Sequence, residues 1–160
     1  MFEIIDAVGK LAYISVTSNG LPLMKDIVWQ QLMAHKPDKV HISIHNADNA
    51  PEVNRTVALM GRLQESGIKP GVNLLVPASK VEHCRKVYVQ LLEVISSEQI
   101  ILIPQKYSDM PTPKQLSIIA NGKPFQSPSC LLGCKSPETF ASISWDKRVN
   151  HCSYAGGKEP

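Results

Sequence analysis

The chain has 160 residues, of which 43% are hydrophobic, and it carries a formal net charge of +3. These values predict one domain with a sizeable core, and they argue against a disordered chain and against a nucleic-acid-binding protein. No stretch of about 20 apolar residues could span a membrane and no signal peptide is visible, so we expect a cytoplasmic protein with reduced or metal-bound cysteines.

Strand and helix patterns alternate along the chain as far as residue 105. Strands are expected over residues 11–17, 39–45, 72–76 and 99–105, separated by helices over residues 23–35, 51–67 and 79–95. The third helix has Ser79 and Glu82 at the spacing of a capping box. This order predicts an α/β fold in residues 1–105, with a parallel sheet and right-handed crossovers. Residues 106–160 are expected to form an irregular, proline-rich extension that carries three of the four cysteines.

The strand over residues 39–45 is the most informative segment, because polar and apolar residues alternate strictly along it. Its odd positions are polar and its even positions are β-branched: His41, Ser43 and His45 against Val40, Ile42 and Ile44. A parallel strand covered by helices on both faces should be apolar throughout. The alternation therefore predicts that one face packs on helices and the other meets a polar or ligand-filled space. A half-exposed antiparallel strand is the alternative.

Several polar residues fall near the carboxyl ends of the predicted strands, where ligands gather in α/β folds. They are Thr17, Asn19, Ser43, His45 and Asn73. Four parallel strands are too few to close a barrel, which needs about six to eight. We therefore expect an open β/α half barrel, resembling a truncated TIM-like barrel, with Ser43, His45 and Asn73 on its concave face. In the alternative interpretation, each polar residue only satisfies the backbone of its own loop.

Three segments in this order resemble the third to fifth strands of the radical S-adenosylmethionine (SAM) barrel. They are Ser15-Val-Thr-Ser-Asn-Gly20, His41-Ile-Ser-Ile-His45 and the Gly-Ile-Lys-Pro-Gly-Val-Asn-Leu-Leu-Val run over residues 67–76, and residues 100–104 would be the sixth strand. The resemblance covers about residues 10–105. It implies that Ser43 and Asn73 contact the SAM ribose or carboxylate, with Thr17 a weaker counterpart.

The chain departs from this family at its defining loop. The Cys-x-x-x-Cys-x-x-Cys sequence that holds a [4Fe–4S] cluster belongs after the first barrel strand, and a glycine-rich loop belongs after the second. Neither occurs here, because the resemblance begins at the third strand. A radical SAM-type oxidoreductase activity is therefore expected only if a missing N-terminal half completes the barrel.

Three cysteines of the extension form a second motif, which is similar to the small C-terminal domains of many radical SAM enzymes. In those domains the cysteines ligate an auxiliary iron–sulfur cluster beside a hairpin. The matching residues are Cys130, Cys134 and Cys152, with Ile143, Asp146 and Val149 in the hairpin pattern. A zinc site and three reduced thiols remain the alternatives. Cys84 lies in a predicted helix and is expected to pack there.

Two function classes follow from these patterns. The first is a radical SAM-like protein or fragment that binds SAM and an iron–sulfur cluster. The second is a non-catalytic α/β binding or assembly module, with zinc as its possible metal. In either class the strand over residues 11–17 would have an unpaired edge, and such edges are association sites. We expect either a homodimer across this edge or a helix over residues 1–8 that covers it.

Overall fold

A computed structural model describes residues 2–127, 142–143 and 148–150. The chain divides into two compact units, Met1–Pro128 and Ser129–Pro160. In the second unit the structure describes β5 (Ser142–Ile143) and β6 (Val149–Asn150), which form an antiparallel pair. Ile143 pairs with Val149 there, as expected for a hairpin in this part of the sequence.

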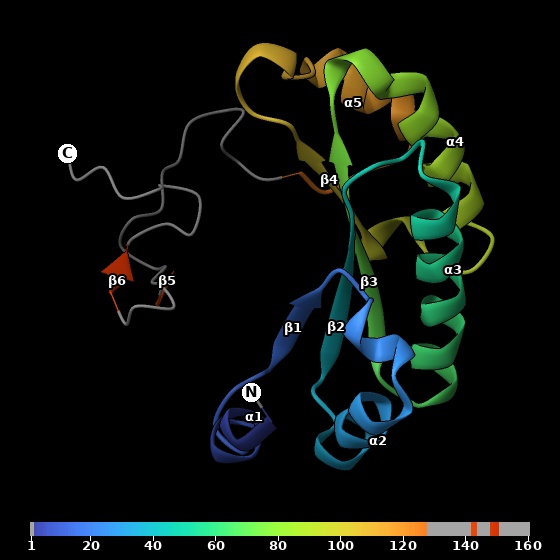
Figure 1. Ribbon diagram of the computed structural model, residues 1–160. Coiled ribbons are helices and arrows are strands. Elements are labelled where there is room, and N and C mark those ends of the chain that lie inside the picture. Colours follow the sequence, from blue (N-terminus) through green and yellow to red (C-terminus); the bar gives the residue numbers. More distant parts are fainter. Residues whose placement is uncertain (1, 128–141, 144–147, 151–160) are drawn as a thin grey trace. The chain divides into compact units, whose positions relative to one another are not determined.

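The first unit is built on an open sheet of four parallel strands in the order β1-β2-β3-β4 (Figure 1). The strands are β1 (Ser15–Ser18), β2 (Lys39–Ile44), β3 (Lys69–Val76) and β4 (Ile100–Pro104). At the outer edge of β4, Ile101 forms an isolated parallel bridge with Gln126. The predicted α/β fold is confirmed, and an open parallel sheet of this kind is consistent with a partial barrel.

Five helices belong to the first unit: α1 (Phe2–Val8), α2 (Asp26–His35), α3 (Ala50–Glu65), α4 (Val81–Leu91) and α5 (Pro113–Ile119). Four single 3₁₀ turns join them to the strands: η1 (Pro22–Met24), η2 (Ala78–Lys80), η3 (Ser97–Gln99) and η4 (Tyr107–Asp109). Figure 1 shows α2, α3 and α4 on one face of the sheet. Crossovers of one hand between strands in sequential order place every connecting helix on the same face.

The core lies between this face and the helices, and it consists mainly of fully buried aliphatic side chains. The strands contribute Val40, Ile42, Ile44, Val72, Leu74, Val76, Ile100 and Leu102, and the helices contribute Leu32, Leu59, Met60, Leu63 and Leu91. Gly20 closes the turn after β1 with a φ of 79°, and a Cβ there would lie 2.8 Å from Leu59 Cδ1. Because both the conformation and the space demand it, only glycine fits this turn without strain.

The sequence predicts a helix over residues 1–8 as one way of covering the sheet edge, and the short helix α1 forms in this segment. It packs on α2, and its Ile5 side chain is buried. Its Asp6 carboxylate lies 2.7 Å from His35 Nδ1, and the Phe2 ring stacks on the His35 ring with centroids 5.2 Å apart. These contacts attach α1 to the end of α2.

Two local features differ from the sequence expectations. The prediction of a capping box at Ser79 and Glu82 is wrong, because α4 begins at Val81 and has no side-chain cap. Ser79 instead donates its N–H and hydroxyl to the two carboxylate oxygens of Asp109, at 2.8 and 2.6 Å. The second difference is α5, a helix in a stretch where none was expected. Its start carries a readable signal, since Thr112 caps it in a box with Gln115.

Candidate functional site

The face of the sheet opposite α2, α3 and α4 presents polar residues of β1 and β2 and, from β3, Asn73. Because side chains alternate along a strand, residues paired across neighbouring strands share a face. Thr17 pairs with His41, which pairs with Gly71. In the adjacent row, Ser43 pairs with Asn73, which pairs with Ile101. The sheet register therefore gathers these residues from four strands on the face that carries no connecting helix.

Ser43 and Asn73 are the two predicted SAM contacts, and they are direct cross-strand neighbours. Both are partly exposed, whereas the residues on either side of each in its strand are buried. Paired residues on adjacent strands lie about 5 Å apart, so one small ligand can contact both side chains. Thr17 lies on the same face on the outer strand β1, and it is exposed.

His41 lies in the row with Thr17 and Gly71, and it contacts Asn73 in the adjacent row. Its Nδ1 lies 3.0 Å from Asn73 Oδ1, and only 6% of the residue is exposed. The ring lies against Gly71, since a Cβ at that glycine would come within 2.8 Å of ring atoms Cε1 and Nε2. Burial lowers the pKa of the His41 imidazole, and the nearby Lys39 ammonium lowers it further, while the hydrogen bond to Asn73 acts in the opposite direction. Burial and the Lys39 charge therefore favour the neutral form of the ring.

The same face changes character along the strands. At the amino end, Lys39 pairs with Lys69, and the pKa of Lys39 is lowered by burial and by the charge of Lys69. At the other end, Leu75 pairs with Ile103, and both are partly exposed. A polar middle thus lies between a cationic end and an apolar end, so the face offers contacts to a ligand with both polar and apolar parts.

Two other predicted site residues lie apart from this row. Asn19 belongs to the turn after β1, where its Oδ1 accepts the N–H of Leu21 at 3.1 Å. His45 follows the last residue of β2, and its Nδ1 lies 3.4 Å from Oε1 of Glu52 on α3. The structure brings together Ser43, Asn73 and Thr17 on one face, while Asn19 and His45 take part in contacts within the adjoining loops.

Glu52 is a buried carboxylate that was not predicted as part of any site. It accepts the backbone N–H groups of His45 and Asn46, at 2.7 and 3.2 Å, and is only 7% exposed. Asn49 caps α3 by accepting the Glu52 N–H. The Asn-x-x-Glu spacing is a readable helix-start signal, although in this fold the glutamate binds the preceding loop. Glu52 therefore fixes the exit of β2.

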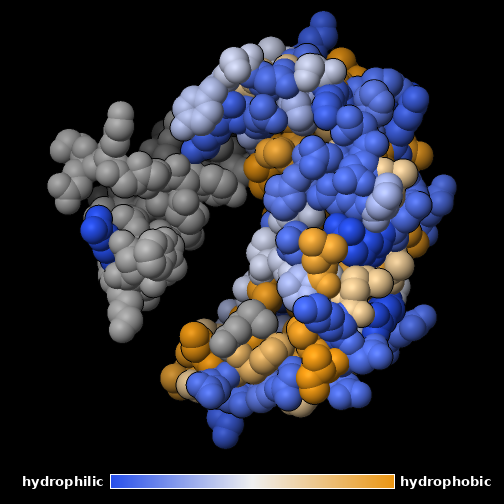
Figure 2. Space-filling model, in the orientation of Figure 1, coloured by the Kyte–Doolittle hydropathy of each residue, from blue (hydrophilic) through white to orange (hydrophobic). Residues whose placement is uncertain are grey.

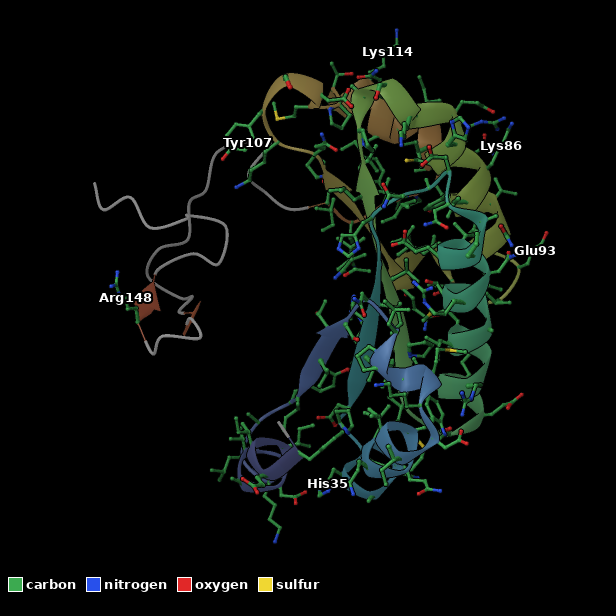
Figure 3. The ribbon with its side chains drawn as sticks, viewed as in Figure 1. His35, Lys86, Glu93, Tyr107, Lys114 and Arg148 are labelled. Atoms are coloured by element: carbon green, nitrogen blue, oxygen red, sulfur yellow. The ribbon has the colours of Figure 1, made fainter. Side chains whose placement is uncertain are left out.

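The loops at the carboxyl edge of the sheet are held to one another by two side-chain contacts. Lys80 donates to both oxygens of the Asp48 carboxylate at 2.9 Å, which joins the loops after β2 and β3. The Ser79–Asp109 contact joins the loops after β3 and β4. Tyr107, with a φ of 73°, projects from the last of these loops and is 91% exposed (Figure 3).

The predicted metal ligands Cys130, Cys134 and Cys152 lie outside the described residues. Cys84 is a buried thiol on α4 that donates to the Leu75 carbonyl oxygen, and burial raises its pKa to about 11. A protonated thiol of this kind is a poor metal ligand. Within the described ranges, no three His, Cys, Asp or Glu side chains come together as a metal site would require.

No helix among residues 2–127 has the length and apolar character needed to cross a membrane. No protein-family model matches this chain, and a search of curated proteins finds no similar sequence.

Proposed function

We propose that the open face of the sheet binds SAM, and that the chain is a radical SAM-like half barrel. The observation that carries this proposal is the pairing of Ser43 with Asn73 on the face without connecting helices. The Ser43 hydroxyl and the Asn73 amide are groups that bind ribose hydroxyls and carboxylates. The sequential parallel strands support the proposal as well, because they are the arrangement of a β/α barrel wall.

Completion of the site requires more contacts than this sheet supplies. We propose that a missing N-terminal radical SAM half, or a second copy of the chain, pairs with the β1 edge. The side chains of Ser15 and Thr17 are exposed on that edge strand, and residues 11–24 contain no charged side chain. Natural edge strands are usually protected by charges or proline, so an uncharged edge supports pairing with another chain. We also propose a cytoplasmic location, where the cysteines of the chain would stay reduced or bind a metal.

Binding can be tested by titrating the purified protein with SAM in a calorimeter. Weak binding is expected, since affinity depends on the complete set of anchoring groups. Ser43→Ala should weaken it about two- to tenfold, the usual effect of losing one hydrogen bond. Ser117→Ala, a matched change at an exposed position on α5, should leave it unchanged. No heat at millimolar SAM, or equal binding by Ser43→Ala, would instead favour a non-catalytic α/β module.

The cluster is proposed for the three cysteines of the C-terminal unit. Bound there, an iron–sulfur cluster would supply electron transfer, and zinc would serve only as a structural ion. Anaerobic reconstitution with iron and sulfide should turn the protein brown, and Cys152→Ala should abolish the colour. Cys84→Ala is the control, because that thiol is buried and protonated. Colourless protein with stoichiometric zinc would replace the cluster by the zinc alternative.

A further inference from the structure

The His41–Asn73 contact gives a direction to the Asn73 amide. Asn73 Oδ1 can only accept a hydrogen bond, so its contact with His41 Nδ1, 3.0 Å away, requires the tautomer of His41 that carries the proton on Nδ1. In the neutral imidazole, Nε2 is then the unprotonated nitrogen. The carbonyl side of the Asn73 amide is occupied by this bond, which leaves the NH₂ group as the side that a ligand can contact.

The backbone at Gly71 helps to fix the position of the His41 ring beside Asn73. Gly71 is paired in register with His41, and a side chain at Gly71 would occupy the place of the imidazole. The ring is almost fully buried, so it has little freedom to turn away from Asn73. Ser43, the register partner of Asn73, presents a hydroxyl beside the amide. The row therefore offers two hydrogen-bond donors side by side.

We propose that His41 is a positioning residue that holds the Asn73 amide with its NH₂ group toward the ligand, so that the site selects ligands with an acceptor oxygen at this point. A carboxylate or a sugar hydroxyl oxygen satisfies this requirement, and an ammonium or amide N–H does not. The inference rests on the proposed function for the identity of the ligand. The orientation of the amide itself depends only on the contacts of His41 and Gly71.

The orientation is tested without ligand by ¹⁵N NMR of the protein labelled at histidine and asparagine. A proton on His41 Nδ1 and none on Nε2 are expected. A proton on Nε2 in place of Nδ1 would overturn the proposal. Because no SAM is present, this measurement stands even if the protein fails to bind SAM, so the two proposals fail separately.

The effect on binding is tested with SAM as the probe and a double-mutant cycle. His41→Leu frees the amide and should weaken SAM binding about three- to tenfold, as loss of an aligned hydrogen bond does. His41→Asn, which keeps an N–H donor near the position of Nδ1, should retain most of the affinity. In an Asn73→Ala background, His41→Leu should have no further effect. An equal loss in both backgrounds would mean that His41 touches the ligand itself, and would overturn the positioning role.

Gly71→Ala gives an independent check, because the added methyl group should displace the imidazole. Its SAM affinity should fall to that of His41→Leu, and the Asn73 NH₂ signals should shift in the same way. The matched control is Gly61→Ala on α3, where a Cβ meets no atom within 4 Å. Binding by Gly71→Ala as tight as that of Gly61→Ala, with unchanged Asn73 signals, would contradict the proposal.

Discussion

The two faces of the β1–β4 sheet are made from alternate residues of the same strands, and along β2 their chemistry differs most clearly. On β2, Ile42 and Ile44 are completely buried under the helices, while Ser43 between them is partly exposed on the other side. In Figure 2, hydrophobic side chains at the surface gather around α1 and the η1–α2 segment, at the lower end of the view. The covered face thus supplies stability, and the open face is available for binding.

The two faces also differ in how their polar groups are satisfied. On the covered side, the buried carboxylate of Glu52 accepts hydrogen bonds from two backbone N–H groups and thereby stabilises the fold. On the open side, the described contact of Asn73 uses only its Oδ1 atom. A residue whose hydrogen-bonding groups are all used holds the fold together, whereas one with donors to spare can bind a ligand.

The largest expected effect is a comparison of neighbouring residues on β2. Ile42→Ala should lower the free energy of unfolding by about 2–5 kcal/mol, because it opens a cavity among fully buried side chains. Ser43→Ala should change it by no more than about 0.5 kcal/mol. Urea denaturation followed by circular dichroism measures both. Similar losses for the two variants would show that the open face is as tightly packed as the covered one.

Glu52→Gln is expected to have the next largest effect. The variant loses the charge that two backbone N–H groups share, which should cost about 1–3 kcal/mol of unfolding free energy. Glu65→Gln, at an exposed position near the end of the same helix, is the matched control and should change it little. If the two variants unfold at the same urea concentration, Glu52 does not hold the β2–α3 loop.

A smaller effect concerns the pH dependence of stability on the open face. The folded state lowers the pKa of His41 below its ordinary value of 6.5, so the unfolded chain takes up a proton first as the pH falls. His41 therefore contributes no pH dependence above about 6.5 and a growing loss of stability below it, down to its folded pKa. His41→Leu should lack this loss.

The check is the unfolding free energy of both proteins between pH 7.5 and 5. The difference between wild type and His41→Leu should be constant above about pH 6.5 and should shift toward the variant below it. Curves that stay parallel over the whole range would mean that His41 is not desolvated in the folded state, and the burial of its ring would have to be revised.

Much of the fold can be read from the sequence because the hydrophobic periodicity is strong. The alternation at His41 and Ser43 predicts a strand with one polar face, and β2 is that strand. The bounds are less predictable, since pairing decides them. β1 starts only at Ser15, where Lys39 provides its first partner, and Leu11 remains 85% exposed. β3 starts earlier than its apolar run, because Lys69 pairs with Lys39.

The site could be predicted only in part. Ser43 and Asn73 are identified by their places in two strands, but their pairing depends on the register between β2 and β3. The roles of His41 and Gly71 depend on the same register, since a ring and a glycine 30 positions apart must meet across two strands. Single-strand periodicity contains no information on register, so these contacts require the three-dimensional structure.

The smallest expected effect is at the carboxyl edge, where the two faces meet. Lys80→Met removes the ion pair with Asp48, which joins the loops after β2 and β3, but the two side chains are 36% and 43% exposed to solvent. Exposed pairs of this kind contribute little because water and salt screen them. Stability should therefore stay within measurement error of the wild type in low and high salt.

Asp109→Ala removes the two bonds to Ser79 and should destabilise the protein more than Lys80→Met does. If Lys80→Met proves the more harmful change in thermal unfolding, the edge is held by charge rather than by hydrogen bonds, and its loops should loosen as salt is added.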